Sequence, residues 1–270
     1  LLKQLFKPTN RDLLKRIGFT LVALAIFIIG TTIQVPGTNS ITKNLGFLEL
    51  VNTMGGGALQ NFSIFALGVM PYITATIVMQ LLGELIPYFQ ELRKQGYTGQ
   101  QKINMYSRYM GILFAFIQGY AFSFMFLGKS ASASEYIYIS IILTAGTAFL
   151  LWLGDQITRK GIGNGLSLII MAGIIATLPQ MFIDAWQGLV VFDGVAQQIA
   201  LGITKFILFV LIYFIILIGV TFVQLAERKI PIQYANKSTS FTNAPSSYVP
   251  IKVNTAGVVP VIFASSLMAI

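Results

Sequence analysis

Uncharged apolar runs of about twenty residues recur along the chain. The first, residues 17–35, has nineteen residues, which as a helix would span about 28 Å, close to the hydrocarbon thickness of a bilayer. The pattern predicts six transmembrane helices, at residues 17–35, 64–83, 109–127, 136–153, 162–178 and 206–225. A seventh run, 256–270, has only fifteen residues, and we expect it to be the first part of a further span.

Residues 47–59 are partly apolar but too few to cross a bilayer as a helix. Their apolar positions follow a helical i, i+3, i+4, i+7 spacing, and three glycines then end the helix. The stripe and the glycines are Phe47, Leu50, Val51, Met54, Gly55, Gly56 and Gly57. The pattern predicts a short external helix that either re-enters the membrane on a glycine hinge or rests at the lipid headgroups.

Three further patterns interrupt the regular spans. Gly68 and Pro71 should bend or loosen the second helix. Asn164, at the start of the fifth run, is expected to serve close helix packing. In residues 226–253 two alternating runs surround a polar stretch, which predicts either a protruding β-hairpin or a solvated connection.

Basic residues fix the expected orientation. Fifteen of the eighteen Lys and Arg residues fall before the first run or after the second, fourth and sixth runs, and only Lys43, Lys129 and Lys205 fall on the opposite side. Because cytoplasmic flanks carry the excess of Lys and Arg, we expect the N-terminus in the cytoplasm.

Composition limits the kinds of catalytic and binding site that this chain can form. Hydrophobic residues make up 55% of the chain and charged residues 10%, and the mean hydropathy is +0.76. The sequence contains no Cys and no His, so thiol nucleophiles, disulfides and Ser–His triads are excluded. The predicted spans carry no ionisable residue, which argues against an ion-coupled transporter or a membrane protease. We therefore expect no catalytic residues, no metal and no cofactor.

Three stretches resemble bacterial SecY. They are Gly68 to Ile73 with Gln80-Leu81-Leu82, Trp152 to Ser167 with its Gly-Ile-Gly-Asn-Gly element, and Val253 to Val258 with Pro260 and Ile262 to Ser266. The resemblance covers the whole chain. It implies an all-α polytopic membrane protein with a SecY-type inverted-repeat helical bundle, six full spans, a partial seventh and a short re-entrant plug helix.

The resemblance also implies domains and site residues. Residues 1–180 would be the N-terminal half, with spans one to five and the plug at about 47–59; residues 181–270 would begin the C-terminal half. The implied pore ring is Val69, Ile73, Leu166, Ile170 and Ile262. Residues that would dock a cytoplasmic partner are Arg228, Lys229, Lys237 and Lys252.

The implied function is a passive channel in the bacterial plasma membrane. It would translocate unfolded secretory polypeptides and release transmembrane segments sideways into lipid. The implied partners are SecE-like and SecG-like membrane subunits, a SecA-type motor ATPase, the ribosome, signal sequences, nascent polypeptides and membrane lipid. A secondary transporter of a small solute, which would also use inverted repeats, is the alternative, and a membrane-embedded enzyme is a further class.

Overall fold

The computed structural model describes residues 11–38, 48–127, 132–190, 196–231, 248–254 and 257. The described residues fall into two compact units, which lie within Leu1–Met181 and Phe182–Ala264. The assignment of residues 1–180 and 181–270 to two halves of an inverted repeat stays a prediction. The predicted seventh span and Ile262 lie outside the described residues.

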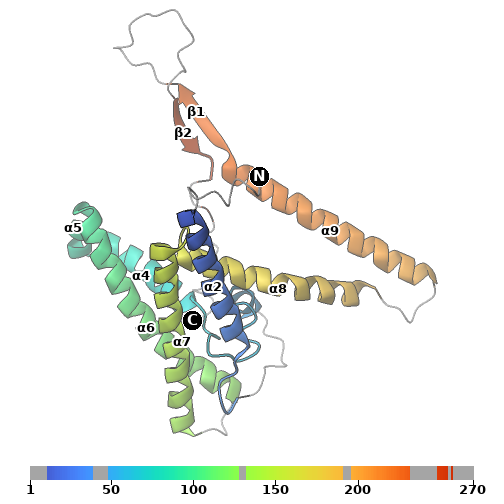
Figure 1. Cartoon of the computed structure of the whole chain (residues 1–270), viewed down its shortest axis with the longest axis horizontal. Helices are drawn as coiled ribbons and strands as arrows, with labels where there is room; N and C mark the ends of the chain where they lie inside the picture. Colours follow the sequence, from blue (N-terminus) through green and yellow to red (C-terminus); the bar gives the residue numbers. More distant parts are fainter. Residues whose placement is uncertain are drawn as a thin grey trace, which may run out of the picture. The chain divides into compact units, whose positions relative to one another are not determined.

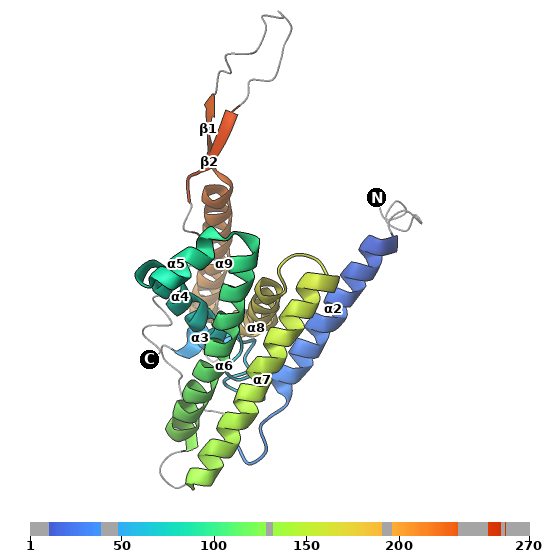
Figure 2. The same ribbon diagram turned by 90° about the vertical axis from the view of Figure 1, so that its left-hand side faces the viewer.

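The first unit is a bundle of helices (Figures 1 and 2). Contacts join α6 to both α4 and α7, and α7 to α2. The buried positions of α6 recur every four residues from Gly99 to Ser123 and are mostly Gly, Ser or Ala, so the helices approach closely there. The helices are α2 (Arg11–Thr32), α3 (Leu48–Met54), α4 (Met70–Leu85), α5 (Pro87–Lys94), α6 (Tyr97–Leu127), α7 (Ala133–Lys160) and the first part of α8 (Gly165–Leu189).

Residues 55–69, here called the buried segment, run without regular helix through the middle of this unit. Phe65 and Val69 belong to a core cluster with α2, α7 and α8, whereas Phe62 and Leu67 belong to a second cluster with α6 and α7. Backbone hydrogen bonds tie the segment to residues that follow α2, from Val35 N–H to Phe62 O at 3.0 Å and from Ile64 N–H to Ile33 O at 3.0 Å. Irregular backbone is tolerated at membrane depth only when protein surrounds it in this way.

The expected continuous helix over residues 64–83 is therefore wrong at its start. The helix begins at Met70, with Pro71 in its first turn. Backbone N–H groups in the first turn have no partner within the helix, so a proline there costs no helical hydrogen bond. Gly68 has a φ of +55°, a left-handed conformation that suits glycine. Gly68 and Pro71 thus mark a helix start and do not bend a longer helix.

Five of the six predicted spans fall on long helices. Among the described residues, the helices long and apolar enough to cross a membrane are α2, α6, α7, α8 and Ile199–Leu225. A sixth span results only if α4 and α5 count together, and they are bent by 98°. The bend falls at Ile86 and Pro87, and Arg93 of α5 forms an ion pair with Glu84 of α4.

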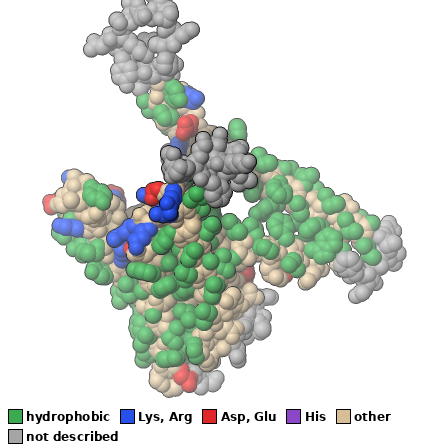
Figure 3. Space-filling model, viewed as in Figure 1, with side chains coloured by type: hydrophobic (Ala, Val, Ile, Leu, Met, Phe, Trp, Pro, Cys, Tyr) green, Lys and Arg blue, Asp and Glu red, His purple; other side chains and the backbone are tan. Residues whose placement is uncertain are grey.

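The second unit contains α9 (Ala196–Leu225), β1 (Glu227–Pro231) and β2 (Tyr248–Lys252). The strands pair antiparallel, with Glu227 opposite Lys252, which confirms the predicted hairpin. Phe182 packs edge-on against Tyr213 of α9, with ring centroids 5.4 Å apart. Hydrophobic side chains cover the outside of α2 and α7 in the first unit and α9 in the second (Figure 3), as expected for surfaces that face lipid.

Candidate pore site

A small apolar cavity lies in the first unit where three parts of the chain meet. Its volume is about 10 Å³, about the space that one water molecule needs. The buried segment and α4 contribute one wall, α3 with Gly55 a second, and α8 a third. The lining residues are Val51, Met54, Gly55, Leu67, Gly68, Val69, Met70, Ile73 and Ile170.

Three of the five predicted ring residues line this cavity. Val69 is buried, and Ile73 and Ile170 are half-buried. No lining side chain is charged or able to donate a hydrogen bond. A constriction of this kind can close without water inside, because apolar walls dewet when they come close together.

Leu166 has different neighbours. A Cβ placed on Gly154 of α7 would lie 2.7 Å from Leu166 Cδ2, so this leucine packs against α7 and does not line the cavity. Its place in the ring stays a prediction. Ile262, the fifth ring residue, lies outside the described residues.

The predicted plug brings its apolar stripe to the same cavity. Val51 is buried and Met54 is half-buried. Asn52 is also buried, and its Oδ1 accepts a hydrogen bond from Gln60 N–H at 2.9 Å. The helix α3 therefore packs against the bundle through Val51 and Asn52, and the choice between a re-entrant and an interfacial helix stays a prediction. Phe47 and the side chain of Leu50 lie outside the described residues.

The Gly-Ile-Gly-Asn-Gly element forms the turn from α7 into α8, which carries Ile170. Asn164 Oδ1 accepts hydrogen bonds from Leu166 N–H at 3.1 Å and Ser167 N–H at 3.4 Å, so it caps α8. A Cβ on Gly165 would lie 2.0 Å from Gly154 O, and Gly163 has a φ of +69°. Asn164, expected to serve packing, is instead a helix cap, and an Asn just before an apolar run was the signal for it.

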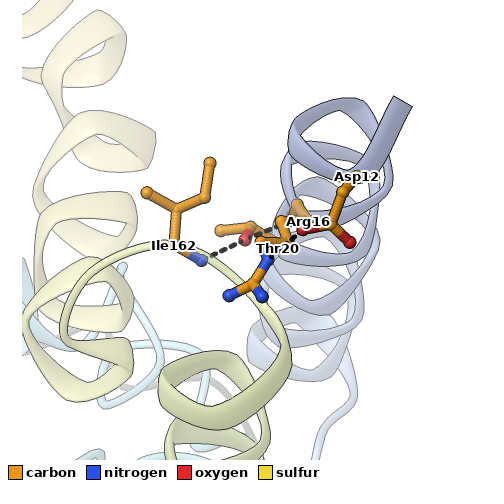
Figure 4. Close-up of polar contacts among 4 residues, drawn as sticks. All are labelled: Asp12, Arg16, Thr20 and Ile162. Atoms are coloured by element: carbon orange, nitrogen blue, oxygen red, sulfur yellow. Dashed lines mark hydrogen bonds and ion pairs between the residues drawn. The ribbon is translucent and has the colours of Figure 1, made fainter. Parts of the chain in front are cut away.

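Thr20 of α2 holds this turn, a role that the sequence did not indicate. Figure 4 shows its hydroxyl between the backbone of its own helix and the turn: Oγ1 donates to Arg16 O at 2.8 Å and accepts from Ile162 N–H at 3.2 Å. A Cβ on Gly161 would lie 2.5 Å from that same oxygen. The start of α8 is thereby fixed to α2.

None of the charged residues that the structure describes lines the apolar cavity. Arg108 of α6 forms an ion pair with Asp155 of α7, a contact that the sequence did not indicate. At one end of α2 and α7 another cavity, of about 400 Å³, is lined mostly by charged residues: Asp12, Lys15, Arg16, Phe19, Arg159 and Lys160. Figure 3 shows basic side chains gathered at that end. Within the described part of the chain, no three His, Cys, Asp or Glu side chains group as a metal site would require.

The predicted docking residues of the hairpin are partly described. Arg228 and Lys229 lie on β1 and Lys252 on β2, all exposed. Lys229 Nζ lies 4.8 Å from the centroid of the Tyr248 ring. Lys237 lies outside the described residues.

Comparisons with known proteins point to one family. A family model described as SecY matches residues 63–270. The protein translocase subunit SecY of Staphylococcus epidermidis is 48% identical over 95% of this chain and 62% of that protein. That of Staphylococcus aureus (strain NCTC 8325 / PS 47) is 47% identical over 94% of this chain and 62% of that protein. The chain thus spans about 62% of the length of these curated relatives.

Solved structures share the fold. A protein-conducting channel has a TM-score of 0.69 at 19% identity, over 95% of this chain and 57% of that one. Sec61 in the canine ribosome-channel complex has a TM-score of 0.67 at 19% identity, with the same coverage. A structure concerned with the plug domain of the SecY protein has a TM-score of 0.64 at 20% identity, over 95% of this chain and 56% of that one.

The fold defines a multi-pass α-helical membrane protein with the architecture of these channels. Within that class, the chain belongs to the SecY family.

Proposed function

We propose that this chain forms the N-terminal part of a protein-conducting channel in the bacterial plasma membrane. The observation that carries the proposal is the apolar cavity at which Val69, Ile73 and Ile170 meet Val51 and Met54. Branched apolar side chains offer a moving polypeptide no hydrogen bonds, so they can close around it without binding it. Ile262 would complete the ring, and Leu166, which packs beside Gly154 of α7 in this structure, stays a predicted member of it.

In this proposal residues 47–59 are the plug that closes the resting channel. The support is that α3 is packed among the cavity residues, with Val51 4% exposed. A similar structure concerns the plug domain of a SecY protein and its closed state. A translocating chain would displace this segment, and apolar segments of that chain would leave sideways into lipid because they partition into hydrocarbon.

The proposed partners follow from family membership. SecE-like and SecG-like subunits would complete the channel, and a SecA-type motor ATPase or the ribosome would dock at the hairpin that carries Arg228, Lys229, Lys237 and Lys252. Exposed cations on β1 and β2 support such docking, as does the fold shared with Sec61 in a ribosome-channel complex.

The proposed orientation places the N-terminus in the cytoplasm. Lys15 and Arg16 near the start of α2 line one cavity with Arg159 and Lys160 at the end of α7. These two helix ends therefore lie on the same side, as the basic residues predict.

Crosslinking tests the function directly. A photoreactive residue at Ile73 or Ile170, in the full-length protein with its partner subunits, should capture a stalled secretory chain. The matched control is Ile175 of α8, which is 54% exposed and should capture lipid. Capture at Ile175 with none at Ile73 and Ile170 would contradict the proposal.

A further inference from the structure

The backbone of α8 touches the backbone of the plug at one glycine. A Cβ placed on Gly173 would lie 2.5 Å from Met54 O and 3.0 Å from Gly56 N, and a Cβ on Gly56 would lie 3.3 Å from Gly173 Cα. Real Cβ atoms almost never come within 3.0 Å of another heavy atom. The atoms that a methyl group would meet are main-chain atoms, so no side-chain rotation can make room for it.

Gly173 lies on the face of α8 that also carries Ile170. Residues three and four apart are neighbours on a helix, and Ile170, Gly173 and Thr177 follow this spacing. Ile170 lines the cavity with Val51, Met54 and Gly55. Thr177 continues the contact, because its Cγ2 would lie 3.9 Å from a Cβ on Gly57. One face of α8 thus carries a ring residue and, one turn further on, the contact with the plug.

Three backbone N–H groups of the plug near Gly173 form hydrogen bonds within the plug itself. Gly55 N–H donates to Val51 O at 3.0 Å, Gly56 N–H to Thr53 O at 3.2 Å and Gly57 N–H to Asn52 O at 2.9 Å. These bonds lie within the plug, so they can persist if the plug moves as a unit. Close packing against Gly173 is then the interaction that such a movement removes here.

We infer that Gly173 is a positioning residue for the plug. Because glycine has no side chain, the plug can lie against α8 in its closed position when the channel is at rest. This inference rests on the proposed function and concerns its regulation. A methyl group at residue 173 forces the plug away from α8, so the closed state loses stability relative to the open state. The helix itself tolerates the change, because alanine is the stronger helix former.

The test compares Gly173→Ala with Gly188→Ala in the full-length protein with its partner subunits. Gly188 lies on the same helix and has nothing within 4 Å of its Cβ position. The first readout is ion conductance of the resting channel in planar bilayers. The second is the rate at which a water-soluble maleimide labels Met54→Cys, which gives a unique label within residues 1–270 because they contain no cysteine.

We expect Gly173→Ala to raise both readouts by about tenfold, since overpacking of this size shifts an equilibrium by that order. Gly188→Ala should leave both at the wild-type level. Unchanged conductance and labelling in a folded Gly173→Ala channel would overturn the inference. If that variant does not accumulate, Thr177→Leu decides: added bulk toward Gly57 should raise both readouts, and wild-type values would equally overturn the inference.

The two proposals fail separately. If a stalled chain crosslinks to Ile170 while Gly173→Ala leaves the plug unmoved, the channel function stands and the positioning role falls. If Gly173→Ala exposes Met54→Cys but no chain crosslinks to Ile73 or Ile170, the contact is real and the channel function falls.

Discussion

At the scale of single residues, glycines decide where the chain can pack. Gly165 permits the start of α8 to lie against α7, because its Cβ would fall 2.0 Å from Gly154 O. Gly161 permits the hydroxyl of Thr20 to reach the turn. The glycines of the Gly-Ile-Gly-Asn-Gly element therefore serve close contacts and a left-handed turn at Gly163, while its asparagine caps the helix.

Replacing Gly165 by alanine tests whether this glycine is needed for the close contact between α8 and α7. The added methyl group meets backbone, so we expect the free energy of unfolding to fall by about 1–3 kcal/mol. Unfolding in detergent micelles, followed by circular dichroism, measures the change. The control, Gly188→Ala, should be as stable as the wild type or more so. Equal stability of the two variants would show that the close contact at Gly165 carries no energy.

At the scale of elements, an ion pair joins two long helices, α6 and α7. The Asp155 side chain on α7 is 23% exposed and Arg108 on α6 is 42% exposed. The Arg16–Asp12 pair, by contrast, lies within α2 and is more exposed, at 51% and 79%. A partly buried pair between helices should contribute more than an exposed pair within one helix.

A double-mutant cycle with Arg108→Gln and Asp155→Asn measures this difference. We expect a coupling of about 0.5–1 kcal/mol in the free energy of unfolding. The matched cycle with Arg16→Gln and Asp12→Asn should give a smaller value. A larger coupling for the exposed pair would contradict the proposed role of Arg108 and Asp155 in joining α6 to α7.

The sequence predicted the elements better than it predicted their contacts. Apolar runs located α2, α6, α7, α8 and α9, and period-two alternation located the hairpin, because both signals are local. Hydropathy could not separate a helix from buried irregular backbone, so the start of α4 was placed too early, at residue 64.

The cavity depends on residues far apart in the chain, and no local pattern shows that Val51, Ile73 and Ile170 meet. The resemblance to SecY supplied Ile73 and Ile170. The i, i+4 spacing of Leu166 and Ile170 did not bring both to the cavity, because Leu166 lies about one turn nearer the start of α8. At that height its side chain lies beside Gly154 of α7.

At the scale of the whole molecule, orientation in the membrane follows from the side on which Lys and Arg gather. A reporter enzyme that is active only after export should be active when fused after Lys129 and inactive when fused after Lys160. Activity assays of the two fusions in whole cells make the comparison. The reverse pattern would contradict a cytoplasmic N-terminus.

The central claim is that an apolar constriction, closed by the plug, separates the two sides of the membrane at rest. Conductance of the resting channel with Ile170→Gly, compared with Ile175→Gly on the same helix, tests it most directly. Both variants carry the same helix penalty, but only Ile170 lines the cavity. We predict ion leakage through Ile170→Gly alone, because loss of apolar bulk wets the constriction. An Ile170→Gly channel that conducts no ions at rest, or equal leakage through both variants, would contradict the account.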